Sequence, residues 1–105
     1  MSTLRPPGLL ASTIGPETGL SVLEHEMLAE KAASLGRAGD KAARDVARLK
    51  SCSADSPERP ALLKAAAASV HGFFIQRELC GMRRHADIIR ELAIPPEVLA
   101  RLGAA

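Results

Sequence analysis

Glutamate and histidine side chains are the groups of this chain that could hold a metal ion. A helix presents two ligands to one metal when they lie three or four residues apart. Glu26 and Glu30 have this spacing, but no Glu-x-x-His or His-x-x-x-His pair occurs around His25, His71 or His85. We therefore expect no resident metal and no cofactor. The alternative is a metal-binding helical bundle that uses Glu26, Glu30, His25 and His85, which requires the second long helix to continue into the third.

Nucleophilic catalysis would need a serine or cysteine beside a base. The sequence contains no Gly-x-Ser-x-Gly turn, no phosphate-binding loop and no dinucleotide-binding fingerprint. Cys80 approaches His85 only if the chain turns back at Gly81. With no nucleophile, base or metal to name, we predict that the protein is not an enzyme, and we assign no catalytic residues.

The densest polar cluster of the sequence follows its two phenylalanines and contains Arg77, Glu78, Arg83 and Arg84. Arg77 lies on the predicted apolar seam, where an arginine usually pairs with a carboxylate and fixes the register of packing. Glu30 or an acid of a partner chain is the expected partner of Arg77. The alternative is a site for an anion or a phosphate, formed by Arg77, Arg83, Arg84 and Arg90.

Residues 86–102 have the pattern of two short helices joined by a tight turn, which is similar to a helix-turn-helix. The second helix offers only Glu97 and Arg101 as long polar side chains, whereas a major-groove reader needs several that reach bases and phosphates. A net charge of +2 and only two aromatic residues also argue against a nucleic-acid partner. We favour a C-terminal helical clasp that packs on the bundle, with a degenerate DNA-binding motif as the alternative.

Composition places the chain among globular domains. Of its 105 residues, 47% are hydrophobic and 25% are charged, which excludes wholesale disorder. No apolar run approaches the roughly 20 residues that span a bilayer, and the start, broken by proline and glycine, does not resemble a secretory signal. We expect a cytoplasmic protein without membrane association, in which Cys52 and Cys80 remain thiols.

Apolar periodicity predicts an all-α fold built on a long antiparallel helical hairpin. Residues 1–16 hold proline and glycine without periodic apolar positions, and we expect them to form a flexible arm before a single helical domain over 17–105. The first helix runs to about Lys50. We expect Ser56 to cap the second helix, with Pro57 at its first position. The alternative is a later start at Arg59, because Pro60 is tolerated only near the start of a helix.

A short C-terminal helical extension follows the hairpin. Gly81 ends the second helix as the residue after its cap, and the alternative is one helix that runs through Gly81. A third helix spans roughly 85–93, and the prolines that follow stop it. A last turn or two covers 97–102.

The antiparallel hairpin fixes which residues of its two helices face each other. Facing positions sum to roughly 107–110, and we expect Phe73 and Phe74 to fall opposite Gly36, Ala38 and Gly39. Two glycines inside a helix cost about 1 kcal/mol each relative to alanine. Phenyl rings that fill the vacant space would compensate for this cost. The other interpretation is that Gly36 marks a kink.

A single hairpin leaves apolar side chains of the first helix uncovered, among them Leu23, Met27 and Leu28. Self-association into a dimeric four-helix arrangement through a two-fold contact would bury them. The alternative is a monomer whose C-terminal segment folds over that surface. We expect a homodimer that acts as a protein-interaction or structural module, with a protein partner that the residues do not identify.

Two segments of the chain, LSVLEHEMLAEKAASLGRAG and FFIQRELCGMRRHADIIRELAIPPEVLARLG, resemble a family of short bacterial proteins of unknown function. The shared marks are a Leu-Glu-x-Glu-Met start, Leu-Gly-Arg, Gln-Arg-Glu-x-Cys-Gly and an Ile-Pro-x-Glu-Val-Leu end. The resemblance covers about residues 18–103. It implies a helical fold and supplies no catalytic residues.

Overall fold

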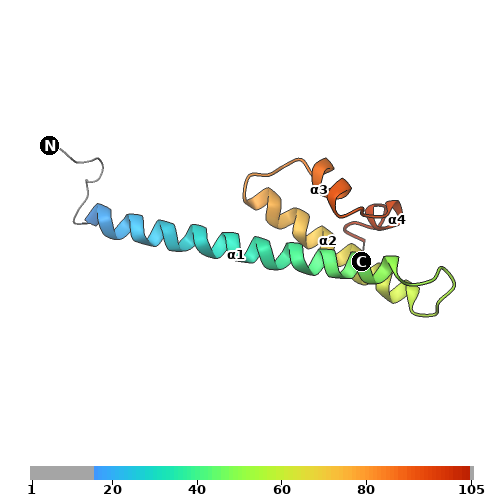
Figure 1. The fold of residues 1–105 in the computed structure, drawn as a ribbon. Helices are drawn as coiled ribbons and strands as arrows, with labels where there is room; N and C mark the ends of the chain where they lie inside the picture. Colours follow the sequence, from blue (N-terminus) through green and yellow to red (C-terminus); the bar gives the residue numbers. More distant parts are fainter. Residues whose placement is uncertain (1–15, 105) are drawn as a thin grey trace. The chain divides into compact units, whose positions relative to one another are not determined.

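The computed structural model describes residues 16–104, which form four helices. In chain order they are α1 (Pro16–Lys50), α2 (Arg59–Leu79), α3 (Ala86–Glu91) and α4 (Pro96–Leu99) (Figure 1). No strand occurs among the described residues, so this part of the chain is all-helical, as predicted. The predicted arm over 1–16 lies, except for Pro16, outside the described residues.

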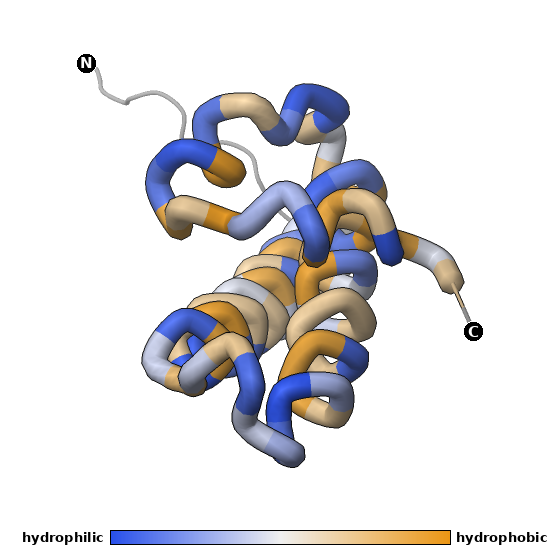
Figure 2. Tube along the Cα trace, turned by 90° about the vertical axis from the view of Figure 1, so that its right-hand side faces the viewer, coloured by the Kyte–Doolittle hydropathy of each residue, from blue (hydrophilic) through white to orange (hydrophobic). Residues whose placement is uncertain are grey.

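Contacts divide the chain into two compact units, residues 1–32 and residues 33–105, and α1 contributes to both. In the first unit, the side chains from residue 21 to residue 32 are exposed. In the second unit, α1 packs against α2, and the C-terminal helices lie across one side of the pair (Figure 2). No helix within 16–104 is long and apolar enough to cross a bilayer. The single domain over 17–105 stays a prediction.

The turn between α1 and α2 is closed by the side chains around the Ser-Pro helix start. The hydroxyl oxygen of Ser56 accepts a hydrogen bond from the backbone N–H of Glu58 at 3.2 Å. Arg59 donates from Nη1 to the carbonyl oxygen of Leu49 at 3.4 Å. Because the N–H groups of a first helical turn have no partner within the helix, the missing N–H of Pro60 costs nothing there. α2 therefore begins at Arg59, the later of the two predicted starts, with Glu58 rather than Ser56 at the cap position.

A glycine turn ends α2, so the alternative of one helix running on into α3 is wrong. Gly81 has a φ of +89°, a left-handed conformation that glycine adopts without steric cost. The N–H of Met82 donates to the carbonyl oxygen of Arg77 at 2.8 Å, and the N–H of Gly81 donates to that of Glu78 at 3.0 Å. These two bonds form the Schellman arrangement that terminates helices.

The same turn ends α3, with alanine in the position that glycine usually occupies. Ala93 has a φ of +50°. Its N–H donates to the carbonyl oxygen of Arg90 at 3.1 Å, and the N–H of Ile94 donates to that of Ile89 at 3.0 Å. An L-residue in this conformation costs about 1 kcal/mol. The turn directs Ile94 into the core, and burial of that side chain offsets the cost.

The core of the second unit joins the hairpin to the C-terminal segment. Burial of its apolar side chains is the main force that holds these elements together. α4 contacts α2 and buries Val98 completely, so the C-terminal segment packs on the hairpin as the predicted clasp does. The buried apolar residues are Ala42, Val46, Leu49, Ala66, Ala67, Val70, Phe73, Phe74, Ile94 and Val98.

Phe73 occupies the space beside Gly39, a predicted contact that lies slightly beyond the register of 107–110. A Cβ atom at Gly39 would lie 3.1 Å from Cε1 and Cζ of the Phe73 ring. The predicted packing role of Gly36 is wrong, because nothing lies within 4 Å of the place where its Cβ atom would be. Phe74 projects in a different direction from Phe73, because consecutive residues lie about 100° apart around a helix. Its ring stacks on His85, with ring centroids 4.1 Å apart.

Candidate functional site

A polar cluster of three side chains lies where α2 ends and α3 begins: Arg77, Glu78 and His85. Nε of Arg77 donates a hydrogen bond to Nδ1 of His85 at 3.1 Å. A guanidinium group can only donate, so Nδ1 accepts and the ring proton is on Nε2. Nε2 donates to Oε2 of Glu78 at 2.9 Å. The three groups therefore fix one tautomer of the neutral imidazole.

The surroundings of this cluster show that it fastens α2 to the start of α3. The ring of His85 lies parallel to the ring of Phe74, with an angle of 5° between the planes. Nη2 of Arg77 donates to the carbonyl oxygen of Arg84 at 2.9 Å, and its guanidinium carbon lies 5.8 Å from the centroid of Phe73. Arg77 is linked to the carboxylate of Glu78 through His85, and its direct pairing with Glu30 or with an acid of a partner chain stays a prediction.

The four arginines of the alternative anion site differ in what they contact. Arg77 uses Nε and Nη2 in the bonds just described, and Arg90 donates to the carboxylate of Asp87 at 2.5 Å. Arg83 and Arg84 are exposed. Two of the four arginines are therefore engaged by groups of the chain, so the anion site gains no support.

The candidate metal ligands fall into different units. His25, Glu26 and Glu30 belong to the first unit, where Nδ1 of His25 donates to the carbonyl oxygen of Ser21 at 2.8 Å. His85 belongs to the second, and α2 does not continue into α3, which a mixed site requires. Across residues 16–104, no three histidine, cysteine, aspartate or glutamate side chains are grouped so that they could hold a metal ion.

In the segment that is similar to a helix-turn-helix, the second helix is short and one of its polar side chains is already paired within the chain. α4 has four residues, Pro96–Leu99. The carboxylate of Glu97 pairs with the guanidinium group of Arg59 on α2. Of the two long polar side chains that the sequence offers here, only Arg101 is left without such a pair among those described, and it is exposed. This arrangement fits the clasp interpretation better than the DNA-binding one.

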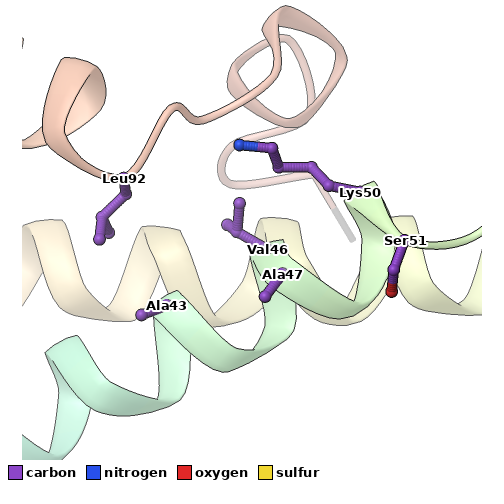
Figure 3. A pocket seen from close by; sticks show the side chains of 6 residues that line it. All are labelled: Ala43, Val46, Ala47, Lys50, Ser51 and Leu92. Atoms are coloured by element: carbon purple, nitrogen blue, oxygen red, sulfur yellow. The ribbon is translucent and has the colours of Figure 1, made fainter.

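A hollow opens between α1 and the turn after α3 (Figure 3). Leu92 points toward α1 on one side, and Lys50 extends along the opening, where Nζ donates to the carbonyl oxygen of Ala93 at 3.2 Å. The lining residues are Ala43, Val46, Ala47, Lys50, Ser51 and Leu92. The hollow has few groups that could recognise a ligand, because the ammonium group of Lys50 is already bonded to the backbone and the other polar side chain is the hydroxyl of Ser51. The hollow is a packing feature rather than a site.

Large apolar side chains are exposed on two helix faces. On α1, four of them fall within seven residues and are 52% to 63% exposed: Val22, Leu23, Met27 and Leu28. On α2 and just after it, Ile75, Leu79 and Met82 are exposed at spacings of four and three residues. An outward helix face normally carries polar residues. These faces are the surfaces that the fold leaves ready for a partner.

The exposed face of α2 is the one surface that the predicted seam does not identify. The seam on α2 runs through Val70 and Phe73, and both are buried. Ile75 and Leu79 lie off that seam, one helical turn apart. Two large apolar residues at this spacing, off the predicted seam of α2, are the signal by which the sequence could have identified this face.

Comparison with known proteins adds a family and no activity. The sequence model of a family of unknown function, DUF6665, matches residues 2–105. No curated protein and no solved structure matches the chain. Because the function of the family is unknown, no substrate, partner or site residue comes to this chain from the match.

Proposed function

The chain belongs to this family of unknown function, and from its exposed helix faces we propose that it is a non-enzymatic interaction module that acts as a homodimer. Each copy brings two long helices, so a two-fold contact between copies gives a four-helix arrangement. A reducing compartment such as the cytoplasm suits Cys52 and Cys80, which are free thiols.

The apolar side chains of α1 carry the proposal. Val22, Leu23, Met27 and Leu28 expose more than half of their surface each. Single exposed apolar residues are ordinary, but a contiguous apolar patch marks an interaction surface. Leu23, Met27 and Leu28 lie within about 140° of the helix surface, whereas Val22 projects to the other side. Complete burial of one such side chain contributes about 1.5–3 kcal/mol. A two-fold contact buries the same patch on both copies at once, which doubles the gain for one surface.

The arrangement of the histidines supports the non-enzymatic part of the proposal. A general base needs a ring nitrogen that is free to take a proton from a substrate. Both ring nitrogens of His85 are bonded to side chains of the same chain. Nδ1 of His25 is bonded to a backbone carbonyl, and the ring of His71 packs beside Gly103. Each of these rings has a structural contact that accounts for its place.

Measurement of mass in solution tests the proposal. Sedimentation equilibrium over a range of concentrations should give twice the chain mass of 11.1 kDa. The double variant Met27→Ser/Leu28→Ser should sediment as a monomer with an unchanged helical spectrum, because both side chains are exposed. The matched control Ile75→Ser/Leu79→Ser also removes two exposed apolar groups, from α2, and should remain a dimer. A wild-type monomer at every concentration would overturn the proposal.

A further inference from the structure

We propose that a second copy of this chain docks antiparallel on one patch of α1, formed by Glu24, Met27, Leu28 and Lys31, with the two-fold axis between Met27 and Leu28. The inference rests on the proposed homodimer and adds the place and direction of the contact. Below, "the α1 patch" means these four residues. All four are exposed, and together they line a shallow hollow on the helix.

The spacing of the α1 patch gives it the symmetry that a two-fold contact requires. In such a contact, if residue i of one copy meets residue j of the other, then j also meets i. The four residues lie at i, i+3, i+4 and i+7 and share one helix face. About an axis between Met27 and Leu28, an antiparallel copy places Glu24 against Lys31 twice on the middle line of the face. Met27 then meets Met27 of the other copy on one flank, and Leu28 meets Leu28 on the other.

Charge determines the direction of the pairing. In the antiparallel arrangement, each Glu24 carboxylate meets a Lys31 ammonium group of the other copy. In a parallel arrangement, Glu24 would meet Glu24 and Lys31 would meet Lys31, and both contacts are repulsive. The patch is therefore complementary to a reversed copy of itself, and this complementarity identifies a second copy as the occupant.

The apolar residues of the α1 patch agree with the charges. Met27 and Leu28 are 63% and 62% exposed, among the most exposed large apolar side chains of the described residues. They flank the line that joins Glu24 and Lys31 on the helix face. Glu24 and Lys31 lie on the middle line, where each charge meets the opposite charge of the other copy, and their long stems cover apolar surface beside them. On one flank, the flexible methionines of the two copies adapt their shapes to each other.

Charge exchange at Glu24 and Lys31 tests the inference. Glu24→Lys turns two attractive contacts of the dimer into two repulsive ones, and Lys31→Glu does the same. Each single variant should dimerise about tenfold more weakly at low salt, from the energies typical of exposed ion pairs. The exchanged variant Glu24→Lys/Lys31→Glu should recover wild-type affinity. An equal mixture of the two single variants should form a mixed dimer as tightly as wild type.

Cross-linking tests the direction separately. In a background with Cys52→Ser and Cys80→Ser, chains with Glu24→Cys are mixed with chains with Lys31→Cys and oxidised. The antiparallel contact predicts a disulfide between the two kinds of chain and none when either is oxidised alone. A disulfide in the Glu24→Cys protein alone would indicate parallel helices and overturn the inference.

The outcomes separate this inference from the proposed function. A wild-type monomer removes the homodimer and with it the α1 contact. A wild-type dimer whose affinity the single charge variants leave unchanged removes only the α1 contact. Because both positions are exposed, circular dichroism should show the same helix content in every variant.

Discussion

The substitution Gly39→Ala should stabilise the α1 helix and, at the same time, create a steric clash in the core. Glycine in a helix interior is about 1 kcal/mol less favourable than alanine. A Cβ atom at Gly39 would lie 3.1 Å from two ring carbons of Phe73, where relaxed carbon contacts are about 3.5–4.0 Å. The ring must shift by several tenths of an ångström, although it is only 7% exposed. We expect this cost to cancel most or all of the gain.

Gly36 supplies the matched control on the same helix. Nothing lies within 4 Å of the place where its Cβ atom would be, so Gly36→Ala should gain about 1 kcal/mol of unfolding free energy. Gly39→Ala should fall about 1 kcal/mol below Gly36→Ala. Gly39→Leu should overpack the site and lose roughly 1–3 kcal/mol relative to wild type.

Thermal and urea unfolding followed by circular dichroism measures these differences at one fixed protein concentration, because self-association also shifts apparent stability. A difference of 1 kcal/mol corresponds to about 4–8 °C in Tm for a domain of this size. If Gly39→Ala stabilises as much as Gly36→Ala, or if Gly39→Leu leaves Tm unchanged, the contact between Phe73 and Gly39 does not hold the hairpin in register.

Three further predictions concern the C-terminal clasp and the DNA-binding alternative. Ala93→Gly should raise Tm, because glycine adopts the positive φ at this position without the steric cost of about 1 kcal/mol that alanine has there. The control Ala100→Gly, at a φ of −68°, should lower Tm. A lower Tm in both variants would refute the strain at Ala93. Val98→Ala should cost roughly 1–3 kcal/mol in urea unfolding, and Ile75→Ala, at an exposed position outside the proposed dimer contact, much less; equal losses would show that α4 does not pack as described. The protein should pass through a DNA column at about 50 mM salt, and retention that salt reverses would restore the DNA-binding alternative.

The sequence predicts the helix boundaries well because they are marked by residues with strong backbone preferences. The Ser-Pro start of α2 and Gly81 after its end each act within a few residues. The third helix ends at Glu91, earlier than its two prolines predict. The left-handed turn at Ala93 is different, since alanine does not favour it. Only burial of Ile94 by distant residues explains that turn, and periodicity along one segment does not show it.

The packing of the two phenyl rings shows a second limit. A register rule for two facing helices predicts the contact between Phe73 and Gly39, but it treats both rings as facing the same way. Residues adjacent on a helix project in different directions, so only one of the two can fill the space beside a given glycine. The place of Phe74 depends on His85, which the turn at Gly81 brings back against α2.

Arg77 shows the same limit within the polar cluster. Its place on the seam predicts an acidic partner at a distance along the hairpin. The turn after α2 instead supplies a histidine eight residues later, which bonds to Arg77 and to a carboxylate. Tight turns of this kind bring together side chains whose meeting depends on backbone geometry rather than on spacing within a helix.

The mass of the wild-type protein in dilute solution tests the central claim most directly. Sedimentation equilibrium should give a species of twice 11.1 kDa that dissociates reversibly as the concentration falls. A single species at the mass of one chain over the whole range would contradict the homodimer and would leave the apolar face of α1 without the partner proposed for it.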